Sequence, residues 1–112
     1  MKGTDRSGVI RFAETRSKVP GLSGSMPVLH RVTLDVKLNC LTPPNKLAAH
    51  VQDEIYFVIE GRADFVHGGQ RDRIEPGDFL FVAAGTEHVF ENFEKVILWR
   101  IYYGPNGGEV PA

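Results

Sequence analysis

Residues 48–61 of this 112-residue chain read AAHVQDEIYFVIEG, and residues 76–92 read PGDFLFVAAGTEHVFEN. Both stretches place short runs of Val, Ile, Phe and Tyr between glycine turns, which is the pattern of strands in an all-β sandwich or barrel. The same punctuation continues along the chain, which holds 12 glycines and 7 prolines. No segment has the length and the 3.6-residue period of a core helix. We therefore expect an all-β fold.

Outside these stretches, the clearest periodicity lies in residues 28–40. One parity holds apolar side chains and a histidine, and the other holds polar side chains, so we expect the first set to face the core. Its members are Val28, His30, Val32, Leu34, Val36, Leu38 and Cys40. Further strands are expected at residues 50–60, 62–67, 71–75, 79–83, 88–93 and 96–103.

The length suits one domain over residues 1–112. We expect an N-terminal arm at residues 1–27, a β-sandwich core at residues 28–104 and a tail at residues 105–112. The arm is expected to hold at most a short edge strand around Val9–Phe12.

The composition narrows the class of protein. Hydrophobic residues make up 42% of the chain, and the formal net charge is −1. A near-neutral chain offers no broad charged surface, so we expect neither a nucleic-acid partner nor a membrane partner. No apolar stretch approaches the ~20 residues of a membrane helix, and no signal-peptide core follows Met1, so we expect a cytoplasmic protein. Cys40 is the single cysteine and is expected to be a small buried apolar residue.

Three polar residues, His50, Gln52 and Glu54, are spaced two apart within an otherwise apolar stretch. On a strand they project from one face, which continues as Tyr56 and Val58. A buried carboxylate beside an imidazole needs a compensating partner. A divalent transition metal is one such partner, and a His–Glu hydrogen bond without metal is the other.

These residues make the two quoted stretches recognisable. They resemble the two motifs of the cupin superfamily, the first with His-x-His, a glutamate and a glycine, the second with Pro-x-Gly, a histidine and an asparagine. The spacings from Glu54 to Gly61 and from His88 to Asn92 match the family pattern. The resemblance covers residues 48–92 and implies a small single-domain bacterial cupin with the double-stranded β-helix, or jelly-roll, fold.

One departure from the family pattern concerns the metal. Ala48 stands where the family has its first histidine. The resemblance then leaves His50, Glu54 and His88 as metal ligands, a two-histidine, one-carboxylate set with open positions for substrate. Gln52 and His30 are the candidates for an additional ligand. The expected cofactor is a divalent transition metal, namely Fe, Mn, Ni, Co or Zn.

Two functions follow from this resemblance. One is a metal-dependent enzyme of the dioxygenase or isomerase type that acts on a small organic molecule. The other is a non-catalytic small-molecule-binding or sensing module with a degenerate metal site, which Ala48 favours. Residues 50–60 are apolar on both faces, so we also expect a homodimer. Arg100, inside an apolar strand, either binds an anionic substrate group or forms a salt bridge at the surface, and we favour the salt bridge.

Overall fold

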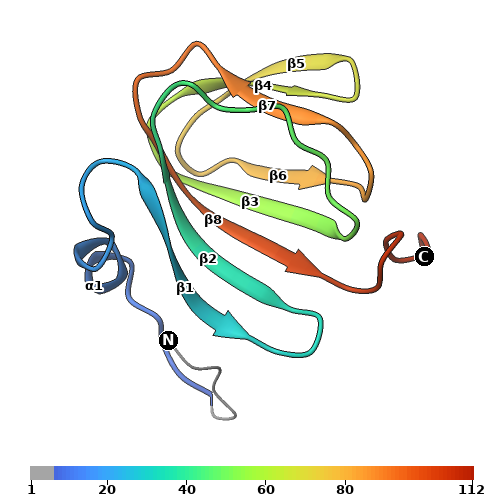
Figure 1. Cartoon of the computed structure of the whole chain (residues 1–112), viewed down its shortest axis with the longest axis horizontal. Coiled ribbons are helices and arrows are strands. Elements are labelled where there is room, and N and C mark those ends of the chain that lie inside the picture. The colour runs from blue at the N-terminus through green and yellow to red at the C-terminus, as the bar shows by residue number, and fades with distance from the viewer. Residues whose placement is uncertain (1–6) are drawn as a thin grey trace.

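The computed structural model describes residues 7–112, which form two antiparallel β-sheets facing each other (Figure 1). The larger sheet has the strand order β1-β2-β8-β3-β6, and the smaller has the order β5-β4-β7. The strands are β1 (Gly24–His30), β2 (Asp35–Leu41), β3 (Asp53–Glu60), β4 (Ala63–His67), β5 (Gln70–Ile74), β6 (Phe79–Val82), β7 (His88–Glu91) and β8 (Val96–Tyr103). This arrangement confirms the expected jelly-roll sandwich, and the strands after β2 begin and end close to their predicted positions.

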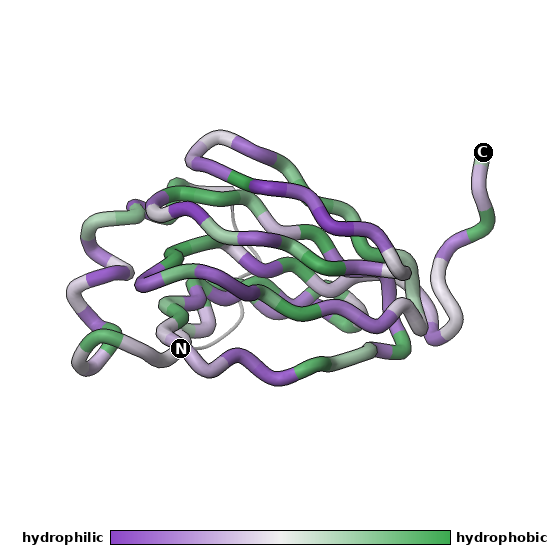
Figure 2. The backbone as a smooth tube through the Cα atoms, turned by 90° about the horizontal axis from the view of Figure 1, so that it is seen from above, coloured by the Kyte–Doolittle hydropathy of each residue, from purple (hydrophilic) through white to green (hydrophobic). Residues whose placement is uncertain are grey.

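The main core lies between the two sheets. Strand alternation directs every second side chain of each strand into this layer, and Figure 2 shows the corresponding alternation of hydrophobic and hydrophilic residues along the strands. The buried members are Tyr56, Val58, Ala63, Phe65, Ile74, Leu80, Val82, Phe90, Val96 and Leu98. Residues of both sheets contribute, so the core holds the sandwich together.

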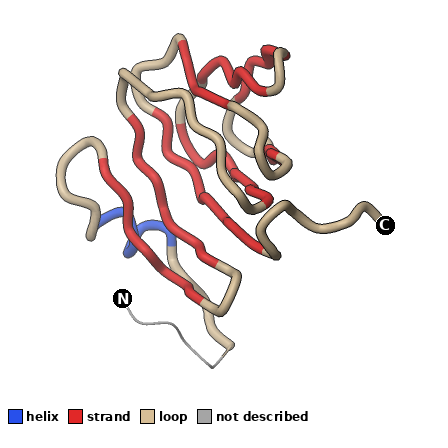
Figure 3. The backbone as a smooth tube through the Cα atoms, turned by 45° about the vertical axis from the view of Figure 1, so that its right-hand side comes forward, coloured by secondary structure: helices blue, strands red, loops and turns tan. Residues whose placement is uncertain are grey.

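A second, smaller core lies on the outer face of the larger sheet, under the helix α1 (Phe12–Ser17). The expected edge strand around Val9–Phe12 is wrong, because Phe12 begins this helix. Phe12 and Thr15 lie on one side of the short helix, and Val19 follows at helical spacing just after its end. These side chains together cover part of the sheet. In Figure 3 the helix lies beside the strands near the N-terminus. This amphipathic pattern spans too few residues for the sequence alone to distinguish a helix from a loop.

The hairpin of β1 and β2 corrects the expectation of one alternating strand over residues 28–40. The chain turns at residues 31–34, where the Arg31 N–H donates to the Leu34 carbonyl at 2.8 Å. Val32, expected in the core, lies at the tip and is 99% exposed. Leu38 and Cys40 are buried as expected, but in the second core on the outer face. The pKa of the Cys40 thiol is raised by burial.

The polar side of β2 therefore faces the space between the sheets. Asp35 stands opposite Tyr102 of β8, Lys37 opposite Arg100 and Asn39 opposite Leu98. Directly opposed residues of an antiparallel pair share a face, and Leu98 belongs to the main core. Alternation alone could not reveal this, because the apolar side of β2 packs in a second core on the outer face of the sheet.

The loop that joins β2 to β3 connects the sheets near their edge (Figure 3). Ala48 forms an isolated bridge with His88, the first residue of β7. The loop thus adds a short fourth segment to the smaller sheet before the chain enters β3 in the larger one. Among residues 7–112, the structure has no helix long and apolar enough to cross a bilayer.

Candidate metal centre

Three different segments supply the side chains of the candidate centre. Glu54 is the second residue of β3, His88 is the first residue of β7, and His50 lies in the loop before β3. The backbone groups of Ala48 and His88 bond reciprocally at 3.0 and 2.9 Å, and the Gly85 N–H donates to the His50 carbonyl at 2.7 Å. These bonds fix the loop against the turn before β7 and bring the two histidines to one place.

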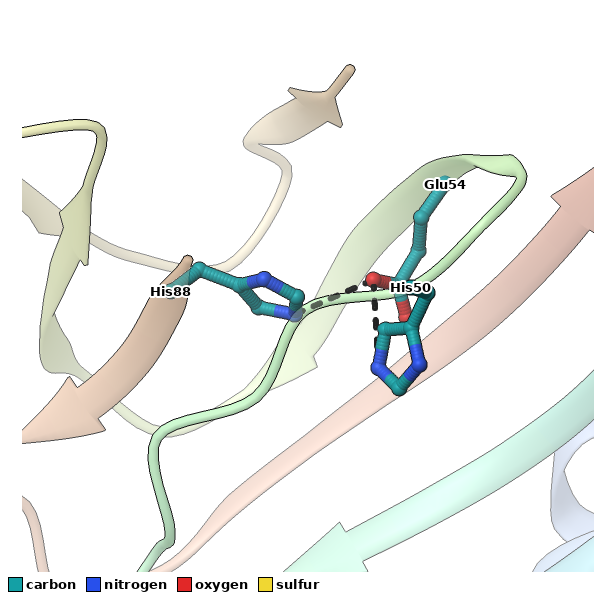
Figure 4. Close-up of side chains that lie close together, drawn as sticks. All are labelled: His50, Glu54 and His88. Carbon is teal, nitrogen blue, oxygen red and sulfur yellow. Dashed lines mark ion pairs between the residues drawn. The ribbon is translucent and has the colours of Figure 1, made fainter. Parts of the chain in front are cut away.

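The imidazoles of His50 and His88 converge on the carboxylate of Glu54 (Figure 4). Glu54 Oε1 lies 3.1 Å from Nε2 of His88 and 4.0 Å from Nε2 of His50. One ligand atom from each residue lies within 4.8 Å of the other two. Glu54 and His88 are buried, whereas His50 is half-buried at the edge of the site. The structure thus brings together the three residues that the motif comparison implied.

Hydrogen bonds to His88 determine which of its nitrogens faces the cavity. Its Nδ1 lies 3.0 Å from the Thr86 carbonyl, which can only accept, so a proton on Nδ1 completes this bond. The neutral ring then has its lone pair on Nε2, which lies 3.2 Å from the Tyr56 hydroxyl and 3.1 Å from Glu54 Oε1. A backbone carbonyl behind a ligating histidine commonly orients the ring for metal binding in this way.

The two imidazoles experience opposite electrostatic environments. Burial is the largest influence on the pKa of His50 and lowers it, and the nearby charge of Glu54 only partly offsets this. Burial also acts to lower the pKa of His88, but Glu54 and the Thr86 carbonyl together raise it above its usual value. The pKa of Tyr56 is raised, mainly by burial and also by Glu54, so its hydroxyl stays protonated.

Glu54 lacks the hydrogen bonds that a buried carboxylate normally has. Neither of its oxygens has a hydrogen-bond partner within the described chain, although His88 Nε2 lies nearby. Leaving a buried charge without partners is costly. A cation placed between one carboxylate oxygen and two imidazole nitrogens would satisfy all three groups, and this donor set suits Fe, Mn, Co, Ni or Zn. The residues present therefore fit a divalent transition metal.

Gln52 does not project beside His50 and Glu54 as expected, because β3 begins only at Asp53. Its side-chain amide donates to the carbonyls of Thr33 at 2.8 Å and Gly104 at 2.9 Å. The nitrogen of this amide ties two neighbouring turns together. The suggestion that Gln52 adds an oxygen ligand remains a prediction.

His30 does not reach the cluster. It stands opposite Asp35, which stands opposite Tyr102, which stands opposite Glu54. Three strand spacings therefore separate it from Glu54, which corresponds to ~14 Å. His30 is also exposed. The additional-ligand role of His30 is corrected on this ground, since the hairpin moved it to the far edge of the sheet.

Ala48 lines the same small cavity as His50 and His88. Its backbone pairs with His88 in the bridge described above, and directly opposed residues of an antiparallel pair share a face. The methyl group at position 48 therefore stands where a longer side chain would approach the cluster. Asn92, by contrast, leaves the face of His88, because β7 ends at Glu91 and Asn92 has a left-handed backbone with φ 53°. Its amide binds Asp64 on the outside.

The cavity has a volume of about 170 Å³ and is lined by further residues that the motif analysis did not assign to the site. Arg100 and Tyr102 of β8 line it, opposite Tyr56 and Glu54 of β3. Arg100 forms the expected salt bridge, with Nη2 2.9 Å from Asp35 Oδ2, but it is buried rather than at the surface. The signal available in the sequence was parity, because Arg100 and Tyr102 share a face with the core residues Val96 and Leu98.

Comparison with known proteins agrees with this architecture. The model of the cupin domain family matches residues 41–98. An uncharacterized protein of Streptomyces coelicolor is 32% identical over 56 residues, 50% of this chain and 53% of that protein. The dimethylsulfoniopropionate lyase DddQ of Ruegeria pomeroyi is 34% identical over 56 residues, 46% of this chain and 28% of that protein. The match thus spans about half the length, or less, of these curated relatives.

Solved structures share the same fold. A cupin-2 domain containing protein from Shewanella frigidimarina superposes with a TM-score of 0.73 at 19% identity, covering 86% of this chain and 95% of that chain. DddQ of Ruegeria pomeroyi gives a TM-score of 0.65 at 20% identity, covering 73% of this chain and 47% of that chain. At these identities the likeness concerns the fold alone.

Proposed function

Because the chain belongs to the cupin domain family, and because its sandwich brings His50, Glu54 and His88 together, we propose that it is a metal-dependent enzyme acting on a small organic molecule. The three residues hold one divalent transition metal, namely Fe, Mn, Ni, Co or Zn. The observation that carries this proposal is the buried carboxylate of Glu54, which has two imidazoles beside it and no hydrogen-bond partner in the described chain.

A metal held by His50, Glu54 and His88 would supply Lewis-acid chemistry toward an oxygen of the substrate. The chain's own residues do the rest. The Thr86 carbonyl orients His88. The Tyr56 hydroxyl lies 3.2 Å from Nε2 of His88 and lines the cavity, where it can donate a hydrogen bond to a substrate. Dioxygenase or isomerase chemistry is the reaction type expected from the family resemblance.

A non-catalytic binding or sensing module is the second candidate, and Ala48 favours it. The methyl group at this position removes one of the four usual protein ligands of the family. Three ligands bind metal less tightly than four, and a weak site suits a module that senses its ligand rather than turning it over. Turnover of a small organic substrate by metal-loaded protein separates the two candidates, because the module binds without converting it.

The proposal is tested with protein purified without chelators or a His-tag. Elemental analysis is expected to find about one transition metal per chain after reconstitution. A metal supplied at a hundredfold excess over its dissociation constant should stabilise the fold by about 2.7 kcal/mol. Thermal unfolding is measured with Mn, Fe(II), Co, Ni and Zn, and identical curves with and without each metal would contradict the proposal.

A matched pair of variants localises the effect. Glu54→Gln removes the charged ligand while keeping the shape of the side chain, and it should abolish the metal-dependent stabilisation. Glu91→Gln changes a glutamate whose partner is Arg71 on the outer face, and it should leave that stabilisation unchanged. Equal metal responses of both variants would remove Glu54 from the site.

We also propose that the chain forms a cytoplasmic homodimer. Support comes from an apolar patch on the outer face of β3 and β6, where Phe57 stands opposite Phe79 and Ile55 opposite Phe81. Phe57 is 40% exposed, Phe79 is 63% exposed and Phe81 is 52% exposed. Such contiguous exposed aromatic residues commonly mark an interface.

A further inference from the structure

Arg100 is a buried cation with a free donor. It is 9% exposed, and its Nε has no hydrogen-bond partner in the part of the chain that the structure describes. Its Nη2 donates to Asp35 Oδ2 at 2.9 Å, and its guanidinium carbon lies 3.8 Å from the centre of the Tyr102 ring. These two neighbours hold the group in place. Buried donors are rarely left unpaired in folded proteins, so the free Nε–H calls for an acceptor.

The position of Arg100 relates this donor to the candidate metal centre. On β3, Tyr56 stands opposite Arg100 and Glu54 stands opposite Tyr102, so Arg100 and Glu54 are diagonal neighbours on one face. Diagonal neighbours are about 7–8 Å apart between Cα atoms. Both Arg100 and the histidines of the centre line the same cavity. One small molecule can therefore contact the guanidinium and the metal ligands together.

The charges near Arg100 favour an anion. Lys37 stands opposite it on the inward face of β2, and Lys46 lines the cavity. Asp35 and Glu54 balance two of these three cations, which leaves an excess of one positive charge. A groove of about 360 Å³ adjoins the cavity and shares Asn39, Leu41, Asn45 and Arg100 with it, which gives a ligand a route from the surface.

We propose that Arg100 forms a carboxylate-binding subsite, so that the ligand of this cavity is a small organic acid. Arg100 lines the cavity, so a carboxylate oxygen accepts a charge-assisted hydrogen bond from its guanidinium, and the opposite end of the molecule faces His50, Glu54 and His88. The cavity volume of about 170 Å³ is below the ~300 Å³ at which sites for drug-sized ligands begin, which restricts the acid to a few carbon atoms. This assignment names the substrate class of the proposed function. It rests on that function only for the role of the metal.

The subsite is tested first on wild-type protein without metal. The Nε–H resonance of Arg100 is followed by ¹⁵N NMR during titration with acetate and propanoate at constant ionic strength. Acetamide and propanamide serve as neutral probes of the same shape. The carboxylates should shift this resonance in a saturable manner, and the amides should not. A resonance that does not respond to the carboxylates, or that responds equally to the amides, would overturn the assignment.

Variants then identify the group responsible. Arg100→Lys keeps the positive charge and the reach toward Asp35 but lacks the Nε–H donor, and it should weaken propanoate binding by about tenfold or more. Arg73→Gln removes an arginine that pairs with Asp64 on the outer face, and it should bind propanoate as the wild type does. Unchanged affinity in folded Arg100→Lys would contradict the proposal. If this variant does not fold, the wild-type titration decides.

Repeating the titration with zinc separates this proposal from the metal centre. Propanoate binding that depends on Arg100 in protein that takes up no metal would support the subsite and contradict the metal proposal. Metal-dependent stabilisation in protein whose Arg100 resonance ignores carboxylates would support the metal centre and contradict the subsite.

Discussion

Glu54 lies on a core strand between residues that pack against the opposite sheet, yet it carries a charge. Its neighbours on the same face of β3 are Tyr56 and Val58, which belong to the main core. The nearby imidazoles of His50 and His88 partly offset the cost of burying this carboxylate in the metal-free protein. A carboxylate buried in this way contributes little to the stability of the metal-free fold, and its burial becomes favourable when a cation is bound.

His88→Gln distinguishes a ligand from a structural histidine. If His88 is a ligand, the variant should lose the metal-induced rise in the denaturation midpoint and keep a metal-free fold close to the wild type. A purely structural role predicts that the metal-free protein itself loses ~1–3 kcal/mol, because the buried bonds to Thr86 and Tyr56 are broken. His67→Gln is the control, since His67 pairs with Asp72 outside the cavity. Equal losses with and without metal would argue against the ligand role.

Ala48→His should restore a fourth ligand. Position 48 lines the cavity and stands directly opposite His88, so a new imidazole would enter the site from the correct side. We expect metal affinity to rise by about tenfold or more, judged from the size of indirect effects on metal sites. Affinity should also fall more steeply below pH ~6.5, because one more imidazole must lose its proton to bind. Metal titrations at two pH values measure both effects, and unchanged or weaker affinity in the folded variant would show that position 48 does not reach the metal.

At the scale of elements, the turn between β3 and β4 depends on a glycine for two separate reasons. Gly61 has φ 86°, and a Cβ at this position would collide with the backbone carbonyl of Lys95 at the start of β8. The turn therefore packs directly on the neighbouring connection.

Gly61→Ala should be strongly destabilising, and Gly69→Ala separates the two causes. Gly69 has φ 81°, but in the described structure a Cβ there meets no atom within 4 Å. Gly69→Ala should cost about 1–2 kcal/mol from backbone strain alone. Gly61→Ala should cost a further ~1–3 kcal/mol, since the backbone must shift to relieve the clash. Urea denaturation midpoints compare the two variants, and equal losses would mean that Lys95 moves freely.

At the scale of the whole molecule, the two outer faces differ in character. The outer face of the smaller sheet carries an ion-pair network in which Asp64 binds Arg71 and Arg73. The larger sheet is covered by α1 over one part and exposes phenylalanines over β3 and β6. A charged face suits solvent, whereas an uncovered aromatic face suits a second copy of the chain.

Phe81→Glu should therefore disrupt the proposed homodimer. Sedimentation equilibrium should give twice the mass of one chain for the wild type and a single-chain mass for the variant at the same concentration. Val32→Glu, at the exposed tip of the β1–β2 hairpin, should remain dimeric. A monomeric wild type at micromolar concentration would contradict the proposed interface.

The sequence by itself determined the fold class, the strands after β2 and the three residues of the candidate centre. Turn glycines and apolar alternation carry strong local signals, and the spacing from Glu54 to Gly61 and the position of His88 identify the motifs. Ala48 was also visible as a departure from them. The fold class and the strands depend on residues close together in the chain, where backbone geometry predicts the outcome. His50, Glu54 and His88 were implied as one set by the resemblance to the cupin motifs.

Only the tertiary structure decided which face of β2 meets the cavity, and with it the surroundings of the site. The apolar face of this strand packs in the second core and its polar face lines the cavity and the groove, so alternation could not tell which face lies between the sheets. The turn at residues 31–34 moved His30 to the sheet edge and placed Asp35 beside Arg100. Asp35, the partner of Arg100, lies 65 residues away in the chain, and Gly104, a partner of Gln52, lies 52 residues away. Contacts of that separation follow from how the sheets pack, and local periodicity carries no information about them.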